Sequence, residues 1–115
     1  MIYIVAGGRD FADKRRMERV LSQMIGPADR IMSGCAPGAD TLAIEYADER
    51  LGERKVLKRP ADWDKYGKSA GFRRNHQMAL EADVLIAFWD GRSKGTKNMI
   101  EEAHKAGLEI HIYRY

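Results

Sequence analysis

The sequence predicts a single α/β domain of the doubly wound type, in which helices cover both faces of a mainly parallel sheet. Short apolar runs alternate with amphipathic segments along the chain, as expected for strands joined by right-handed helical crossovers. Glycine and polar residues follow most of the apolar runs, which is typical of strand-to-helix turns. The length of 115 residues suffices for one hydrophobic core and not for two. We therefore expect one domain, residues 1–115, with about five mainly parallel strands in the order 3-2-1-4-5.

The strands are predicted from short runs rich in β-branched residues. The run IYIVA ends at Gly7 and Gly8, and DVLIAFW is the strongest strand signal in the chain. Because these runs are continuously apolar, without alternation, they indicate strands that are buried on both faces. The predicted strands are residues 2–6, 30–33, 55–57, 83–89 and 109–113.

The helices are predicted where apolar residues recur at every third or fourth position. The first such segment begins its apolar face at Met17 and ends at Gly26 and Pro27, and the second begins at Asp40 and ends at Gly52. The predicted helices are residues 17–25, 40–51, 67–81 and 96–106. The segment RPADWDKYG, between the third strand and the third helix, is predicted to be a loop.

The composition excludes several classes of protein. Apolar residues make up 44% of the chain and charged residues 32%, and no run approaches the roughly 18 consecutive apolar residues of a membrane span. The N-terminal segment MIYIVAGG lacks the basic region and the long apolar stretch of a secretory signal. A single cysteine, Cys35, cannot form an internal disulfide, which suits a reducing compartment. We expect a soluble, cytoplasmic protein with no membrane contact.

The net charge and the spacing of the histidines indicate which ligands the chain can bind. A net charge of +3 tolerates an anionic ligand without requiring a nucleic acid, and the basic cluster at residues 14–16 is best interpreted as a solvated helix face. His76, His104 and His111 do not have the spacing of metal ligands. We therefore predict no metal and no cofactor.

Four loops with unusual small and polar residues follow predicted strands: GGRD, SGCAPGAD, RPADWDKYG and DGRSKGT. In a doubly wound sheet the carboxyl ends of the strands share one edge, so these loops can surround one crevice. Gly38 and Gly95 stand at predicted helix starts, where unpaired N–H groups favour an anion. Glycines at such turns often serve only to allow a positive φ, so each loop alone is weak evidence. Neither GxGxxG nor GxxxxGK[ST] is present, which excludes the two common phosphate loops.

Individual polar residues in these loops suit different parts of a ligand. Arg74 and Arg9 carry guanidinium groups that suit a phosphate, although Arg74 could instead form a surface salt bridge. The carboxylates of Asp40 and Asp10 could accept hydrogen bonds from ribose hydroxyls, with an N-cap as the alternative role for Asp40. Asp90, directly after the strongest strand, is the best candidate for a general base.

Two aromatic residues of the predicted loop at residues 59–67 are candidates for contact with a base. Trp63 and Tyr66 could form a lid that stacks on a nucleobase, and packing against their own loop is the competing interpretation. The sequence does not decide between them.

Four motifs together resemble a known family. GGRDF at residues 7–11, SGxxxGAD at 33–40, PADWxxYGxxAGxxRN at 60–75 and GT at 95–96 are similar to the SLOG superfamily, specifically the small group related to YpsA that carries the DUF2493 domain. The resemblance implies a Rossmann-like fold that binds a nucleotide or a nucleotide-derived ligand. The candidate ligand-binding residues are Gly7, Gly8, Arg9, Asp10, Ser33, Gly34, Gly38, Asp40, Trp63, Tyr66, Arg74, Asn75, Gly95 and Thr96.

More distant relatives of the superfamily suggest two alternative functions. The LOG phosphoribohydrolases use an arginine in RKxxM and a glutamate in PGGxGTxxE, and residues 74–78 and 95–96 of this chain match these motifs in part. Met99 stands where the glutamate would be, and methionine can neither stabilise an oxocarbenium-like state nor activate water. Glu102, one turn further along the same helix face, is the other candidate catalytic carboxylate beside Asp90.

The leading interpretation is therefore a module that binds AMP, ADP-ribose or a similar ligand at the carboxyl ends of the strands. A nucleoside-5′-monophosphate phosphoribohydrolase is the first alternative, and binding of single-stranded nucleic acid, as in the DprA relatives, is the second. We also expect a homodimer formed through the third or fourth predicted helix, because so small a sheet leaves strand edges and helix faces thinly covered.

Overall fold

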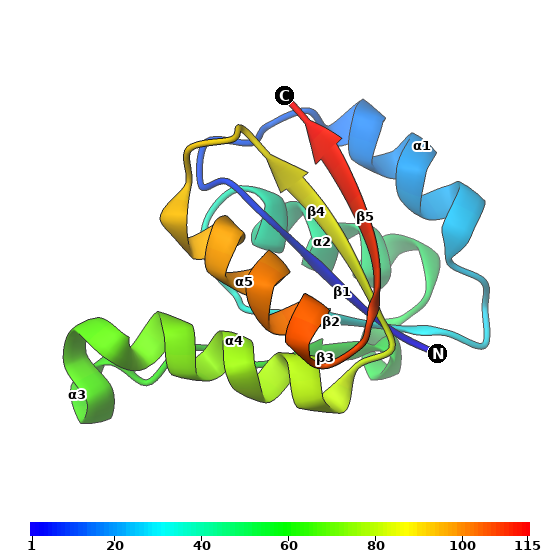
Figure 1. Ribbon diagram of the computed structural model, residues 1–115. Helices are drawn as coiled ribbons and strands as arrows, with labels where there is room; N and C mark the ends of the chain where they lie inside the picture. The colour runs from blue at the N-terminus through cyan, green and yellow to red at the C-terminus, as the bar shows by residue number, and fades with distance from the viewer.

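A computed structural model describes residues 1–115 and shows a five-stranded parallel sheet in the order β3-β2-β1-β4-β5 (Figure 1). The strands are β1 (Ile2–Gly7), β2 (Arg30–Ser33), β3 (Val56–Lys58), β4 (Val84–Trp89) and β5 (Glu109–Arg114). The predicted fold class and strand order are confirmed. Central β1 pairs with β2 on one side and β4 on the other, so that Ile4 is opposite both Met32 and Leu85.

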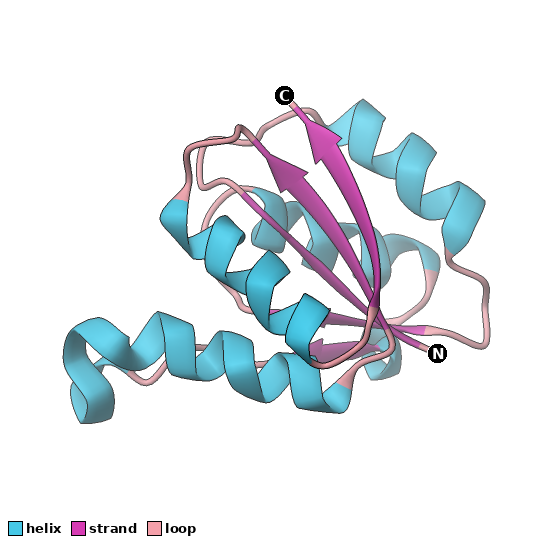
Figure 2. Cartoon of the chain, viewed as in Figure 1, coloured by secondary structure: helices cyan, strands magenta, loops and turns pink.

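The helices alternate with the strands along the chain (Figure 2). They are α1 (Lys14–Met24), α2 (Ala39–Arg50), α3 (Trp63–Tyr66), α4 (Ala70–Glu81) and α5 (Lys94–Lys105), with 3₁₀ turns at Glu53–Lys55 and Gly67–Ser69. Asp13 begins α1 by accepting a hydrogen bond from the backbone N–H of Arg16 at 3.0 Å, and Ser93 begins α5 by accepting from Thr96 at 3.4 Å. Such caps satisfy N–H groups that have no partner inside the helix.

The segment predicted to be a loop before α4 contains the short helix α3 instead. Asp62 caps α3 by accepting a hydrogen bond from the backbone N–H of Lys65 at 3.1 Å. Gly67, at φ +56°, follows α3 and is the first residue of the 3₁₀ turn that leads into α4. Four helical residues are too few to show an apolar periodicity, which is why the sequence pattern did not predict them.

Two apolar layers hold the helices on the sheet. Tyr3 and Val5 of β1 belong to the cluster that packs against α1 and α2, and Ile4 and Ala6 belong to the cluster that packs against α4 and α5. This strict alternation places each pair of helices on its own face, because successive side chains of a strand point to opposite sides. None of the helices is long and apolar enough to cross a membrane.

The arm, which we define as residues 60–73, comprises α3, the following 3₁₀ turn and the first residues of α4. Figure 1 shows α3 and the first turns of α4 extending away from the sheet.

Candidate functional site

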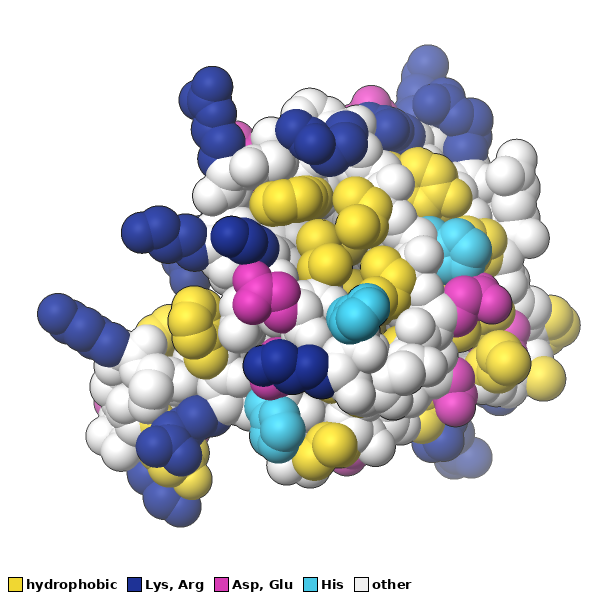
Figure 3. All heavy atoms as spheres, viewed as in Figure 1, with side chains coloured by type: hydrophobic (Ala, Val, Ile, Leu, Met, Phe, Trp, Pro, Cys, Tyr) yellow, Lys and Arg dark blue, Asp and Glu magenta, His cyan; other side chains and the backbone are white.

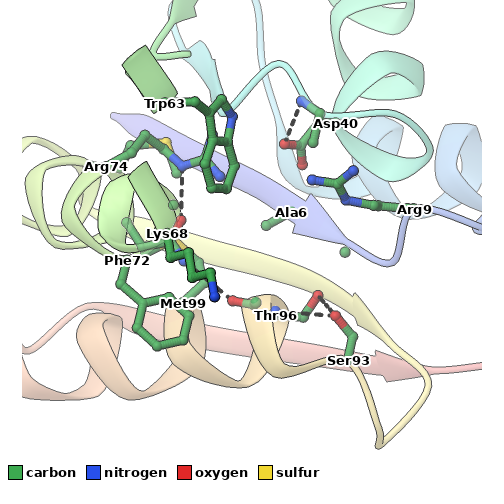
Figure 4. Close-up of a pocket in the computed structure, with 16 residues that line it drawn as sticks. Ala6, Arg9, Asp40, Trp63, Lys68, Phe72, Arg74, Ser93, Thr96 and Met99 are labelled. Carbon is green, nitrogen blue, oxygen red and sulfur yellow. Dashed lines mark hydrogen bonds between the residues drawn. The ribbon is translucent and has the colours of Figure 1, made fainter. Parts of the chain in front are cut away.

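A pocket of about 260 Å³, the strand-end pocket, lies at the carboxyl end of β1, where the strand order reverses. Ligands of doubly wound sheets bind at this position. Loops from both sides of β1, the arm and the start of α5 line it (Figure 4). Among the residues predicted from the sequence, those that line it are Gly7, Arg9, Asp40, Trp63, Arg74, Asn75, Gly95 and Thr96.

Asp40 is the carboxyl group of this pocket. It lies in the first turn of α2, where Gly38 is the N-cap residue, so Asp40 does not have the N-cap position that was one of its predicted roles. Its Oδ2 atom accepts a hydrogen bond from the backbone N–H of Ala36 at 3.1 Å. Burial raises the pKa of Asp40 to about 6, and the Ala36 N–H group and the nearby Arg74 and Arg9 charges oppose this rise.

Arg9 approaches the same side of the pocket from the loop after β1. Figure 4 shows its guanidinium group pointing toward Asp40. Arg9 is exposed, and no hydrogen bond or ion pair of the structure uses its guanidinium group. It is therefore available to an anionic ligand.

Gly34 and Gly38 allow the loops around Asp40 to pack closely. A Cβ atom on Gly38 would lie 2.6 Å from the backbone carbonyl carbon of Arg9, and one on Gly34 would lie 2.9 Å from Oδ2 of Asp40. Gly38 also has a φ of +82°, which side chains disfavour. These two glycines bring the loops after β1 and β2 together and do not themselves line the pocket. Ser33 and Gly8 are buried beside them, also outside the lining.

Arg74 connects α4 to the loops at the ends of β2 and β3. Its Nη1 atom donates to the backbone carbonyl of Gly34 and, at 3.5 Å, to that of Arg59, and its Nε atom donates to Asn75 Oδ1 at 3.0 Å. Burial lowers the pKa of Arg74, against the opposing effect of Asp40. The residue is half-buried and forms no salt bridge, so the surface ion pair considered for it is absent. Only its Nη2 atom has no hydrogen-bond partner in the structure.

Asn75 joins α4 to the beginning of α5. Its side-chain Nδ2 atom donates to the backbone carbonyl of Gly95 at 3.2 Å and to Asn98 Oδ1 at 2.9 Å. The residue is buried, and all its polar side-chain atoms have partners. Asn75 thus fixes the first turn of α5, including Thr96, at the wall of the pocket.

The arm closes the pocket on its outer side. The Trp63 side chain faces the pocket and lies over Gly71 of α4, where a Cβ atom would come within 3.5 Å of the indole ring (Figure 4). Trp63 is 52% exposed, so its ring is open to a ligand. Tyr66 does not line this pocket. Instead, the guanidinium group of Arg73 lies over the Tyr66 ring, 4.6 Å from the ring centroid.

The other candidate carboxylates lie outside the strand-end pocket. Asp90 accepts hydrogen bonds from the backbone N–H groups of residues 92 and 93, both at 2.8 Å, and these bonds lower its pKa. Asp10 accepts a hydrogen bond from the Tyr115 hydroxyl at 2.6 Å, and Glu102 lies 3.3 Å from Nδ1 of His76. Neither Asp90 nor Glu102 lines the strand-end pocket, and their catalytic roles remain predictions.

The sequence of the chain matches a known protein family. The model of the YspA, cpYpsA-related SLOG family matches residues 1–66. The chain belongs to this family. It is also 41% identical over 85 residues to the Gene 61 protein of Mycobacterium phage D29, an alignment that covers 70% of this chain and 67% of that protein.

The family match covers only part of the strand-end pocket. The matched residues include the loops that carry Arg9 and Asp40 and reach through α3, which carries Trp63. The residues of α4 and α5 that complete the pocket lie after the matched region. The family model thus covers the loops that carry Arg9 and Asp40, and α4 and α5 supply the remaining wall of the pocket.

Eight lining residues of the strand-end pocket were not among the predicted site residues: Ala6, Ala36, Lys68, Gly71, Phe72, Met78, Ser93 and Met99. Lys68 and Phe72 lie on the arm, and Met99 forms part of the wall from α5, with an exposed fraction of only 1%. The sequence alone marks Met99 only as the residue that stands in place of a glutamate. Lys68 and Phe72 fall inside the motif PADWxxYGxxAGxxRN at positions that the motif leaves open, so the pattern held no signal for them.

Proposed function

We propose that the strand-end pocket binds a nucleotide or a nucleotide-derived ligand such as AMP or ADP-ribose. The proposal rests on one observation: positively charged groups, a carboxyl group and an aromatic ring line the same pocket. Arg9 and Lys68 supply positive charge, Asp40 supplies a buried carboxyl group, and Trp63 supplies an exposed aromatic ring. A nucleotide presents the matching groups, which are a phosphate, a ribose with hydroxyl donors and a flat base.

The arrangement of these groups suggests an orientation for the ligand. Lys68 lies on the side of the first turn of α5 (Figure 4), where the helix dipole also favours a phosphate. In this orientation the ribose hydroxyls donate to Asp40 and the base stacks on Trp63, with Arg9 available to a second phosphate. An ADP-ribose ligand would use both cations, whereas AMP would use one.

A proton NMR time course with AMP and with ADP-ribose tests the proposal, because it reports binding and cleavage in one sample. We expect broadening of the base and anomeric proton signals, and a loss of affinity on the order of tenfold in Lys68→Ala, which removes one charge-assisted contact. Lys105→Ala, an exposed lysine in the last turn of α5, is the matched control and should bind as the wild type does. Sharp, unshifted signals for both ligands at millimolar protein would contradict the proposal.

One observation favours the phosphoribohydrolase as a second candidate. Asp40 is the only carboxyl group that lines the strand-end pocket, and its pKa is raised to about 6, so near neutral pH it is poised to exchange a proton. An N-glycosidic cleavage needs such a carboxylate to stabilise the oxocarbenium-like state or to activate water. The apolar side chain of Met99 in the same wall speaks against it.

The same time course separates the two candidates. Free adenine and new anomeric signals of ribose 5-phosphate, present with wild type and absent with Asp40→Asn, would establish the glycosidase. Broadened nucleotide signals that persist unchanged for hours would support a binding module.

A further inference from the structure

The positive charge of the chain is concentrated on and beside the arm. Residues 58–74 contain six basic and two acidic residues, a net charge of +4, whereas the whole chain carries +3. The other 98 residues therefore carry a net charge of −1. A surface with this charge is complementary to a polyanion.

A second hollow, the arm groove, has a volume of about 610 Å³ and lies along this segment. Its walls include Lys58, Arg59, Tyr66, Phe72, Arg73 and Arg74. Phe72 and Arg74 also line the strand-end pocket, so the two hollows adjoin. The groove thus extends the proposed nucleotide site over a surface that a mononucleotide would leave empty.

Two of the four lysine and arginine residues in the arm groove, Lys58 and Arg73, are exposed and have no carboxylate partner. Glu81 neutralises Arg59, with an oxygen 3.0 Å from its Nε atom. Lys58 and Arg73 have no carboxylate within 4.0 Å. Arg73 donates to the Ser69 hydroxyl at 3.0 Å, which holds its guanidinium group over the groove without cancelling its charge.

Exposed aromatic rings stand among these cations. Tyr66 is 39% exposed and Phe72 is 52% exposed, the same fraction as Trp63. Lys65 and Arg73 lie 5.1 and 4.6 Å from the centroid of the Tyr66 ring. Figure 3 shows Lys and Arg side chains gathered with hydrophobic ones over α3 and the first turns of α4. Bases stack on such rings while cations contact the phosphates, which is how proteins bind single strands without reading their sequence.

We propose that the arm binds single-stranded nucleic acid, with one nucleotide of the strand in the strand-end pocket and the neighbouring phosphates beside Lys58 and Arg73. This inference rests on the proposed function, because it places a nucleotide in the same pocket. A second copy of the chain fits the arm less well, since two arms in contact would oppose two surfaces of charge +4.

Fluorescence anisotropy with 5′-fluorescein-labelled 12-mers, dA12 and the corresponding RNA, tests the inference. We expect the affinity to fall on the order of tenfold between 50 and 200 mM KCl, as for about three phosphate contacts. The double variant K58E/R73E should weaken binding at least tenfold. The control R15E/R19E changes two exposed basic residues of α1 by the same total charge and should stay within twofold of wild type.

A third variant tests stacking without any change of charge. Tyr66→Ala should weaken binding on the order of tenfold, because one base loses its aromatic partner. Thermal unfolding of each variant, followed by circular dichroism, shows which proteins are folded and can be compared.

The AMP titration separates this inference from the proposed function. K58E/R73E should bind AMP as wild type does, because neither residue lines the strand-end pocket. AMP binding without 12-mer binding in the wild type would overturn the inference alone, and failure of both ligands would overturn the proposed function as well. Equal losses of 12-mer affinity in K58E/R73E and R15E/R19E would indicate diffuse electrostatic attraction and would overturn the inference. Light scattering would also overturn the inference if the wild type were a dimer that binds no 12-mer and K58E/R73E were a monomer.

Discussion

Asp40 shows how burial changes the chemistry of a single residue. Its exposed fraction is 6%, and its carboxyl group has only one backbone donor, the N–H of Ala36. Desolvation disfavours the charged form, and a pKa of about 6 means that the group ionises close to neutral pH. The cost of ionising Asp40 in the folded protein should appear as a dependence of stability on pH.

We predict that Asp40→Asn changes this dependence. The unfolded chain releases the Asp40 proton near pH 3.8 and the folded chain holds it to about pH 6, so a rising pH favours the unfolded state over that interval. Between pH 4 and pH 7 the free energy of unfolding of the wild type should therefore fall by about 2 kcal/mol relative to Asp40→Asn.

Urea unfolding of both proteins at several pH values measures this difference. Asp48→Asn, at an exposed position of α2, serves as the control and should follow the wild-type curve. Parallel curves for wild type and Asp40→Asn would show that the carboxyl group is well solvated.

Arg74 is the second residue whose role depends on its contacts. An exposed arginine could be removed at a cost within about 1 kcal/mol. Arg74 instead donates to two backbone carbonyls and to Asn75. We predict that Arg74→Ala lowers the free energy of unfolding by about 2 to 3 kcal/mol, because acceptors in a half-buried place lose a charged donor.

The neighbouring Arg73→Ala is a suitable control for this measurement. Arg73 is exposed, and its removal should change stability by about 0.5 kcal/mol or less. Equal stabilities of the two variants in urea would show that the Arg74 hydrogen bonds contribute nothing. A loss of nucleotide binding in Arg74→Ala should therefore be interpreted only under conditions in which the variant is folded.

At the scale of elements, the loops after β1 and β2 pack against each other at the start of α2. The backbone carbonyl of Gly8 accepts hydrogen bonds from the N–H groups of Phe11 and Ala39, both at 3.2 Å. Gly38 lies between these loops with a φ of +82°. The position of Arg9 beside Asp40 depends on this close contact.

We predict that Gly38→Ala destabilises the protein by more than about 2 kcal/mol, because a Cβ atom would combine an unfavourable φ with a collision against the Arg9 backbone. Gly107→Ala is the matched control. Gly107 has a similar φ of +77°, but no atom lies within 4 Å of its added Cβ, so only the conformational cost of about 1 kcal/mol remains. Thermal or urea unfolding measures the stability of both variants. Equal losses of stability in Gly38→Ala and Gly107→Ala would show that the loops after β1 and β2 move apart freely.

At the scale of the whole molecule, the expected homodimer remains a prediction. Leu80 is 63% exposed near the end of α4, away from the arm, and offers an apolar contact on one of the two helices expected at the interface. We predict that light scattering at micromolar concentration gives twice the chain mass of 13.1 kDa.

The variant Leu80→Glu should shift this mass toward the monomer, because it places a charge in an apolar contact. Gln23→Glu, at an exposed position of α1, should leave the mass unchanged. A monomeric mass for wild type across the whole micromolar range would contradict the dimer.

The sequence alone determined the fold class, the strand order and the family of this protein. The alternation of apolar runs and amphipathic segments is local information, and parallel crossovers restrict how such segments can be arranged. Most predicted element boundaries agree with the structure within two residues, and the strand at Arg30–Ser33 coincides with β2. The exceptions are α3, which is too short to have a period, and the first helix, whose first turn precedes its apolar face. The helix predicted from residue 67 begins as α4 at Ala70, because residues 67–69 form a 3₁₀ turn.

The solvation and the contacts of the site residues were decided only by the tertiary structure. Arg74 hydrogen-bonds to the carbonyl of a residue 40 positions earlier in the chain, and Asp40 owes its pKa to burial by segments that meet only in the fold. Asp90 and Glu102 had the right chemistry, but their side chains lie outside the pocket. A sequence pattern records which groups are present, whereas their solvation, direction and partners depend on contacts between residues far apart in the chain.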